Sequence, residues 1–151
     1  MKAAFKRTVH VVSESKPGDK WQYFYRQFEP SYLEWFLKEG LSARPPYLVA
    51  RRNLVNVMPE LEGLYDKLCE LAGGSDHAAR LLSLYNPTPY ISGCSQLAWL
   101  EGEPFLIRNY DYNPLQWEGL VLETKWHRRR VIGMSDCLWG LLDGMNDSGL
   151  V

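Results

Sequence analysis

The sequence lacks an excess of charge of either sign. Its 151 residues carry 17 Lys and Arg against 18 Asp and Glu, which leaves a formal net charge of −1. Proteins that attract nucleic acid or anionic membrane surfaces through long-range electrostatics carry a basic patch or a clearly positive charge. We therefore expect no nucleic-acid partner.

Long apolar runs are also missing. A membrane-spanning helix needs about 18 or more consecutive apolar residues, and no segment of this chain has them. Lys2, Lys6 and Arg7 interrupt the short apolar stretch at the start, where a signal peptide would have a continuous one. We expect a soluble, cytoplasmic protein with no membrane span.

Cysteine and histidine are scarce. Cys69, Cys94 and Cys137 are far apart and form no CxxC pair, which argues against a disulfide framework or a zinc knuckle. The three histidines are equally scattered and show no metal-binding spacing. We expect no bound metal, and a cysteine with a function must act alone.

What the chain does contain is enough apolar material for a core, with 46% hydrophobic and 13% aromatic residues. Up to about Tyr85 the sequence has the signals that begin helices, because proline or serine precedes each segment whose apolar residues recur with the helical period. The four helices are expected to begin at Pro30-Ser31, Pro46, Pro59 and Ser75. The third has the clearest apolar stripe and is expected to end at Gly73-Gly74.

Beyond the proline-rich residues 86–89 the period changes to that of strands. Two hairpins are expected, pairing residues 95–100 with 105–110 and residues 119–126 with 130–134. The second turn, His127-Arg128-Arg129, is read as a solvated basic turn, with a contact to a substrate anion as the alternative. Helices followed by strands predict an α+β fold.

Cys94 stands at the start of the first expected strand. If the first hairpin is centred between Gly102 and Glu103, counting outward places Cys94 directly across from Asp111. A thiol and a carboxylate would then share one face, with Cβ atoms about 5 Å apart. The alternative is that Cys94 is a small buried core residue, which is the usual fate of a free cysteine.

The residues around Cys94 resemble a known family. The words Gly93-Cys94-Ser95, Arg108-Asn109-Tyr110-Asp111 and, from Asp143, Asp-Gly-Met-Asn-Asp-Ser-Gly-Leu resemble the choloylglycine hydrolase and acyl-coenzyme A:6-aminopenicillanate acyltransferase group of N-terminal nucleophile (Ntn) hydrolases. The last word carries Asp147 where that group usually has Glu. The helical segment before the cysteine resembles the propeptide of the acyltransferase-like branch.

The resemblance implies an enzyme that cleaves itself and then acts on a linear, non-peptide amide C–N bond of a small molecule. Gly93-Cys94 would be the autoprocessing site, and Cys94 would carry both the nucleophilic thiol and, once freed, the basic α-amine. Arg108 would favour the thiolate, and Asp111 would hold the α-amine. No metal or organic cofactor is implied.

One geometric difficulty stands against this interpretation. Arg108 and Asp111 are three residues apart and point to opposite faces of an ideal strand, so a bulge or the strand end would have to re-aim one of them. The ordinary alternatives are a surface ion pair for Arg108 and a turn-forming role for Asp111. Cys69 and Cys137 are expected to be structural.

The resemblance also predicts the organisation of the chain. Residues 1–93 would be a mainly helical prosegment, and residues 94–151 the first strands of an Ntn-hydrolase αββα sandwich. The family's oxyanion donors lie after the last word, beyond Val151, so we expect a truncated sheet that needs the missing C-terminal part or pairing with a second copy. The alternative is a non-catalytic scaffold or assembly module of the same fold, inactive because it is truncated or unprocessed.

Overall fold

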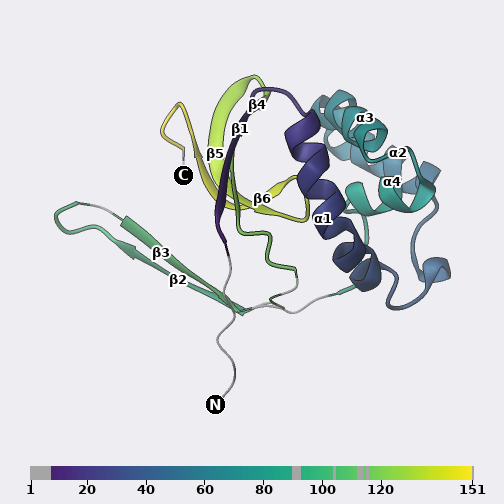
Figure 1. Ribbon diagram of the computed structural model, residues 1–151, viewed down its shortest axis with the longest axis horizontal. Coiled ribbons are helices and arrows are strands. Elements are labelled where there is room, and N and C mark those ends of the chain that lie inside the picture. The colour runs from purple at the N-terminus through teal and green to yellow at the C-terminus, as the bar shows by residue number, and fades with distance from the viewer. Residues whose placement is uncertain (1–7, 90–92, 104, 112–113, 115, 151) are drawn as a thin grey trace, which may run out of the picture.

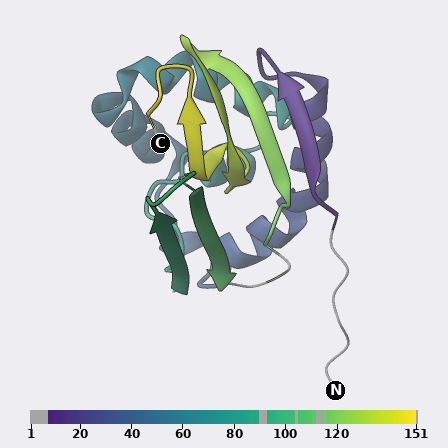
Figure 2. The ribbon, with the colours of Figure 1, turned by 90° about the vertical axis from the view of Figure 1, so that its left-hand side faces the viewer.

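The computed structural model has one four-stranded sheet, one two-stranded ribbon and four α-helices among the residues it describes, which are 8–89, 93–103, 105–111, 114 and 116–150. The helices lie on one side of the four-stranded sheet (Figures 1 and 2). The ribbon β2–β3 is a separate two-stranded sheet, which contacts the larger one at β6. The elements are, in order, β1 (His10–Glu14), α1 (Asp19–Phe36), α2 (Tyr47–Val57), α3 (Glu62–Leu71), α4 (Asp76–Leu82), β2 (Gly93–Trp99), β3 (Phe105–Asp111), β4 (Leu120–His127), β5 (Arg129–Asp136) and β6 (Gly140–Asn146). The predicted α+β class is confirmed.

The larger sheet has the strand order β1-β4-β5-β6. β1 pairs parallel to β4, from His10 opposite Leu120 to Glu14 opposite Thr124, and β4, β5 and β6 are antiparallel. β1 is short and mostly exposed, so its sequence has no clear alternation and did not predict a strand. Through β1, the residues before Cys94 contribute directly to the sheet formed by the later ones.

The first helix begins eleven residues earlier than predicted, at Asp19 rather than at Pro30, and Pro30 lies inside it. A proline inside a helix removes one backbone hydrogen bond and costs about 3 kcal/mol. Burial of an aromatic stripe offsets this cost, because four aromatic side chains of α1 are at most 2% exposed: Trp21, Tyr25, Tyr32 and Phe36. The carboxylate of Glu14 accepts hydrogen bonds from the N–H groups of Lys20 (3.1 Å) and Trp21 (3.2 Å) and so stabilises the helix start.

The other predicted helices are confirmed. α2 follows Pro46, and α3 follows a short 3-10 turn at Pro59–Leu61. The Ser75 hydroxyl accepts a hydrogen bond of 3.1 Å from the N–H of Ala78 and caps α4, as its position predicts. Gly73 and Gly74 end α3 with φ values of 93° and 69°, which side chains other than glycine rarely adopt.

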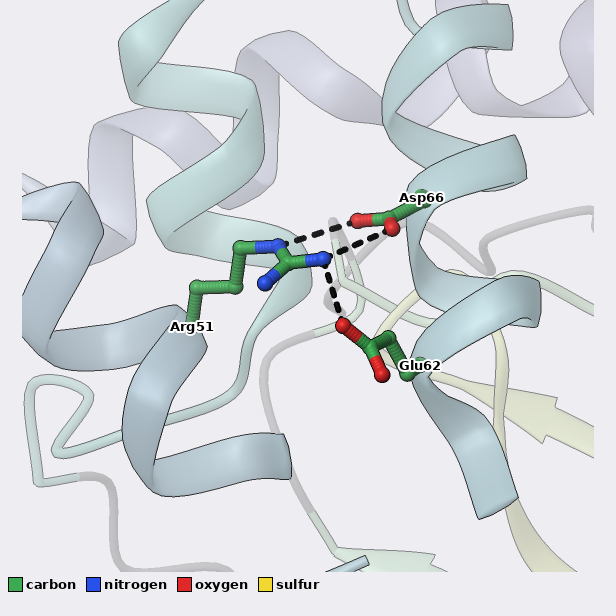
Figure 3. A network of polar contacts seen from close by, with 3 residues as sticks. All are labelled: Arg51, Glu62 and Asp66. Carbon is green, nitrogen blue, oxygen red and sulfur yellow. Dashed lines mark hydrogen bonds and ion pairs between the residues drawn. The ribbon is translucent and has the colours of Figure 1, made fainter. Parts of the chain in front are cut away.

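An ion-pair network connects α2 to α3 (Figure 3). Arg51 donates two hydrogen bonds to Asp66, from Nε at 3.2 Å and from Nη2 at 2.8 Å, and one from Nη2 to Glu62 at 2.7 Å. The Arg51 side chain is 30% exposed, so solvent screens these pairs. The bidentate geometry fixes how the two helices align more than it adds to stability.

The second hairpin is confirmed, with β4 and β5 joined at Arg128, whose φ is 54°. The register of the first hairpin differs from the prediction by one residue. Trp99 pairs with Phe105, their rings stack with centroids 6.4 Å apart, and Gly102 adopts a φ of 74° at the turn. This aromatic cross-strand pair closes the ribbon and leaves Leu100 in the loop, so Cys94 lies opposite Tyr110 and not opposite Asp111.

The core joins the helices to the sheet. Glu118, which is 4% exposed, connects the two, because its carboxylate accepts hydrogen bonds from the Tyr32 hydroxyl of α1 (2.8 Å), the Leu138 N–H (2.8 Å) and the Ser135 hydroxyl of β5. Burial raises the pKa of Glu118, although these hydrogen bonds oppose the shift. The indole of Trp139 completes the connection by donating to the Leu82 carbonyl at 2.9 Å.

Candidate active site

The two-stranded ribbon β2–β3 carries Cys94, Tyr110 and Arg108 on one face. Cys94 in β2 lies directly opposite Tyr110 in β3, and Gln96 lies opposite Arg108. Residues two apart in a strand share a face, so the thiol of Cys94 is on the side that carries Tyr110 and Arg108. Arg108 is a diagonal neighbour of Cys94, a position that a long side chain can bridge.

Arg108 is held between the ribbon and β6. Its Nη1 donates to the carbonyl of Leu142 and lies 3.7 Å from Oδ2 of Asp143. Its guanidinium carbon is 5.7 Å from the centre of the Tyr110 ring, which is within the range of a cation–π contact. The Nε atom is buried and has no hydrogen-bond partner in the described part of the chain.

Asp143 connects to Tyr110 as well. The Tyr110 hydroxyl donates to Oδ2 of Asp143 at 2.7 Å. Burial raises the pKa of Tyr110. The hydrogen bond to Asp143 and the negative charge of Asp143 raise this pKa further, whereas the positive charge of Arg108 lowers it. Tyr110 therefore stays a neutral donor. In the sequence, Asp143 is notable only as the first residue of a family word, and no local pattern predicts its contact with Tyr110.

Asp111 is on the other face of the ribbon. It pairs with Gly93, and its carboxylate accepts a hydrogen bond of 2.7 Å from the Asn109 side chain. The structure thus separates Asp111 from the thiol of Cys94. The register partner of Asp111 is Gly93, the residue before Cys94.

A largely apolar groove of about 770 Å³ lies between the ribbon and strands β4, β5 and β6 of the larger sheet. Arg108, Tyr110 and Asp143 form its polar end. The remaining lining is mostly hydrophobic and consists of Trp99, Leu100, Phe105, Leu106, Val121, Ile132, Gly133, Met134, Gly144 and Met145. A volume of this size accommodates a small organic molecule, with most of its surface against apolar side chains.

The other two cysteines lie elsewhere. Cys69 is on α3 against the helical core, and burial raises the pKa of its thiol. Cys137 is in the turn between β5 and β6, where its N–H donates to the Tyr32 hydroxyl at 3.1 Å.

Within the described residues, no helix is long and apolar enough to cross a membrane.

Residues 99–151 match the family model described as acyl-coenzyme A:6-aminopenicillanic acid acyl-transferase. The resemblance to that family is confirmed. The matched segment includes Arg108, Asp111 and Asp143 and begins after Cys94. No curated protein and no solved structure matches the chain.

Proposed function

We propose that this protein is an Ntn-type acyltransferase or amide hydrolase whose nucleophile is the thiol of Cys94. The observation that carries the proposal is that Cys94 shares one face of the ribbon with Tyr110 and Arg108. Tyr110 and Arg108 in turn line the polar end of the apolar groove. The family match supports the proposal, because β3, which carries Tyr110 and Arg108, lies inside the matched segment, and Cys94 stands five residues before that segment begins.

The first step is self-cleavage. The Cys94 thiol attacks the carbonyl carbon of Gly93, the C–N bond to Cys94 breaks, and the acyl group passes from nitrogen to sulfur. Water then hydrolyses the thioester, which leaves a carboxylate on Gly93 and a free thiol and α-amine on Cys94. Glycine before the cysteine leaves the attacked carbonyl uncrowded.

In the turnover reaction the α-amine, with an unperturbed pKa near 8, takes the thiol proton. The thiolate attacks the carbonyl of a linear amide, the amine of the substrate leaves with a proton, and an acyl thioester remains on Cys94. Water then gives an acid, or a second amine gives a new amide. In this proposal Arg108 stabilises the thiolate, and Asp111 holds the α-amine.

The groove supports an apolar acyl group as the part of the substrate that is held. Its hydrophobic lining binds the acyl chain or ring, and its polar end receives the amide. The chemistry requires no group besides thiol, amine and fixed hydrogen-bond donors.

Intact-mass analysis of the longest product that contains this sequence tests the proposal. Wild-type protein is expected to split between Gly93 and Cys94 and to gain the mass of one acyl group on the Cys94 fragment when incubated with an activated acyl ester. Cys94→Ala should do neither, and Cys69→Ala should do both. A protein whose cleavage and acylation survive Cys94→Ala contradicts the proposal, and an unreactive Cys94 favours a non-catalytic assembly role.

A further inference from the structure

Asp143 contacts the two residues that share a ribbon face with Cys94. Its Oδ2 accepts a hydrogen bond from the Tyr110 hydroxyl, with 2.7 Å between the oxygens, and lies 3.7 Å from Nη1 of Arg108. Both partners are on β3, whereas Asp143 is on β6. One carboxylate therefore fixes two side chains of the ribbon to the four-stranded sheet.

These contacts are shielded from solvent. The side chains of Arg108 and Asp143 are 19% and 29% exposed. An ion pair that is mostly removed from water interacts more strongly than an exposed pair and is screened less by salt. The neighbouring Leu142 carbonyl accepts from the same Nη1, so adjacent backbone and side-chain acceptors of β6 together determine where the guanidinium lies.

We infer that Asp143 is the positioning residue of this site, holding Arg108 over the Tyr110 ring and so on the face of the ribbon that carries the Cys94 thiol. The inference rests on the proposed function, in which Cys94 is the nucleophile and Arg108 stabilises its thiolate. Tyr110 is the second part of the device, because its ring supports the guanidinium and its hydroxyl orients the carboxylate.

The sign of one measurement separates positioning from simple charge. Asp143 is negative, so if it acted only through space, its removal would make the thiolate easier to form. If it positions Arg108, its removal lets the cation leave the thiol, and the thiolate becomes harder to form. The two roles move the pH dependence of Cys94 alkylation in opposite directions.

The experiment measures the rate of alkylation of Cys94 by iodoacetamide between pH 6 and 10, with peptide mass mapping to separate Cys94 from the other thiols. Asp143→Asn is expected to raise the midpoint by about one pH unit, which is the usual effect of losing a nearby opposite charge. Tyr110→Phe keeps the ring and should shift the midpoint in the same direction by less. In the Arg108→Gln background, Asp143→Asn should cause no further rise.

Asp147→Asn is the matched control. Its side chain is 44% exposed and lies near Arg129, so the same chemical change should leave the midpoint unaltered. A lowered or unchanged midpoint in Asp143→Asn overturns the inference, and if that variant does not fold, Tyr110→Phe decides by the same criterion. If Cys94 is acylated but the midpoint of its alkylation is the same in Asp143→Asn as in wild type, only the positioning role is refuted. If the midpoint rises in Asp143→Asn but Cys94 is never acylated, only the proposed function is refuted.

Discussion

The indole nitrogen of Trp21 donates a hydrogen bond of 2.7 Å to the backbone carbonyl of Leu138, 117 residues further along the chain. Trp21 is on α1, in the part that precedes Cys94, and Leu138 is in the turn between β5 and β6. Both side chains are buried in the same core. The residues on either side of Gly93-Cys94 are therefore packed into one structure.

This shared core predicts that cleavage between Gly93 and Cys94 does not separate the two pieces. The parallel pairing of β1 with β4 and the buried aromatic stripe of α1 do not depend on the peptide bond. Residues 1–93 and the remainder beginning at Cys94, produced as two polypeptides in one cell, should elute together at a 1:1 ratio in size-exclusion chromatography. They should separate only in denaturant, and separate elution in native buffer would contradict the prediction.

Trp21→Ala should destabilise the protein by about 3–5 kcal/mol, because it removes a large buried side chain and leaves the Leu138 carbonyl without its donor. Tyr23→Ala is the control on the same helix, since Tyr23 is 60% exposed, and it should cost less than about 1 kcal/mol. Urea unfolding followed by tryptophan-independent circular dichroism measures both. Equal losses would show that α1 does not anchor the core as described.

Glu118 predicts a pH dependence of stability. Its pKa is raised in the folded protein, so folding favours the protonated form, and its contribution to stability is lost as pH rises from the unfolded value near 4.3 through the folded pKa. Glu118→Gln keeps an acceptor for Tyr32 and Leu138 and removes the ionisation. The free energy of unfolding of this variant relative to wild type should therefore increase between pH 5 and pH 8.

Glu118→Ala is the contrasting variant. It leaves the hydroxyl of Ser135 and the N–H of Leu138 without their acceptor, and the Tyr32 hydroxyl with only the Gln116 carbonyl at 3.1 Å, which should cost on the order of 3 kcal/mol at either pH. A Glu118→Gln variant that loses stability as strongly as Glu118→Ala would show that the carboxylate charge itself is required.

Gly133 predicts a steric effect beside the candidate site. A Cβ atom at this position would contact the Asp143 carbonyl oxygen and lie 3.0 Å from the Gly144 Cα, because β5 and β6 approach closely there. Gly133→Ala should destabilise the protein by about 1–3 kcal/mol. Gly63→Ala, in open space on α3, should stabilise it by about 0.5 kcal/mol. Thermal unfolding compares the two, and a neutral Gly133→Ala would contradict the close approach.

Local signals in the sequence determined much of the fold. Pro46, Pro59 and Ser75 preceded helices as expected, because the signals that start a helix act over a few residues. The change of period after residue 89 correctly predicted the two hairpins. Two of the three family words, at residues 108–111 and from Asp143 onward, lie within residues 99–151, over which the match confirms the resemblance.

The tertiary structure decided what depends on distant partners. The start of α1 is set by burial of its aromatic side chains, including Trp21 against the turn between β5 and β6, which outweighs the local effect of Pro30. Stacking of Trp99 on Phe105 set the ribbon register and moved Cys94 from Asp111 to Tyr110. The pairing of Asp143 with Arg108 and Tyr110 joins strands more than 30 residues apart, and no short-range pattern can encode it because it exists only when the ribbon lies against β6.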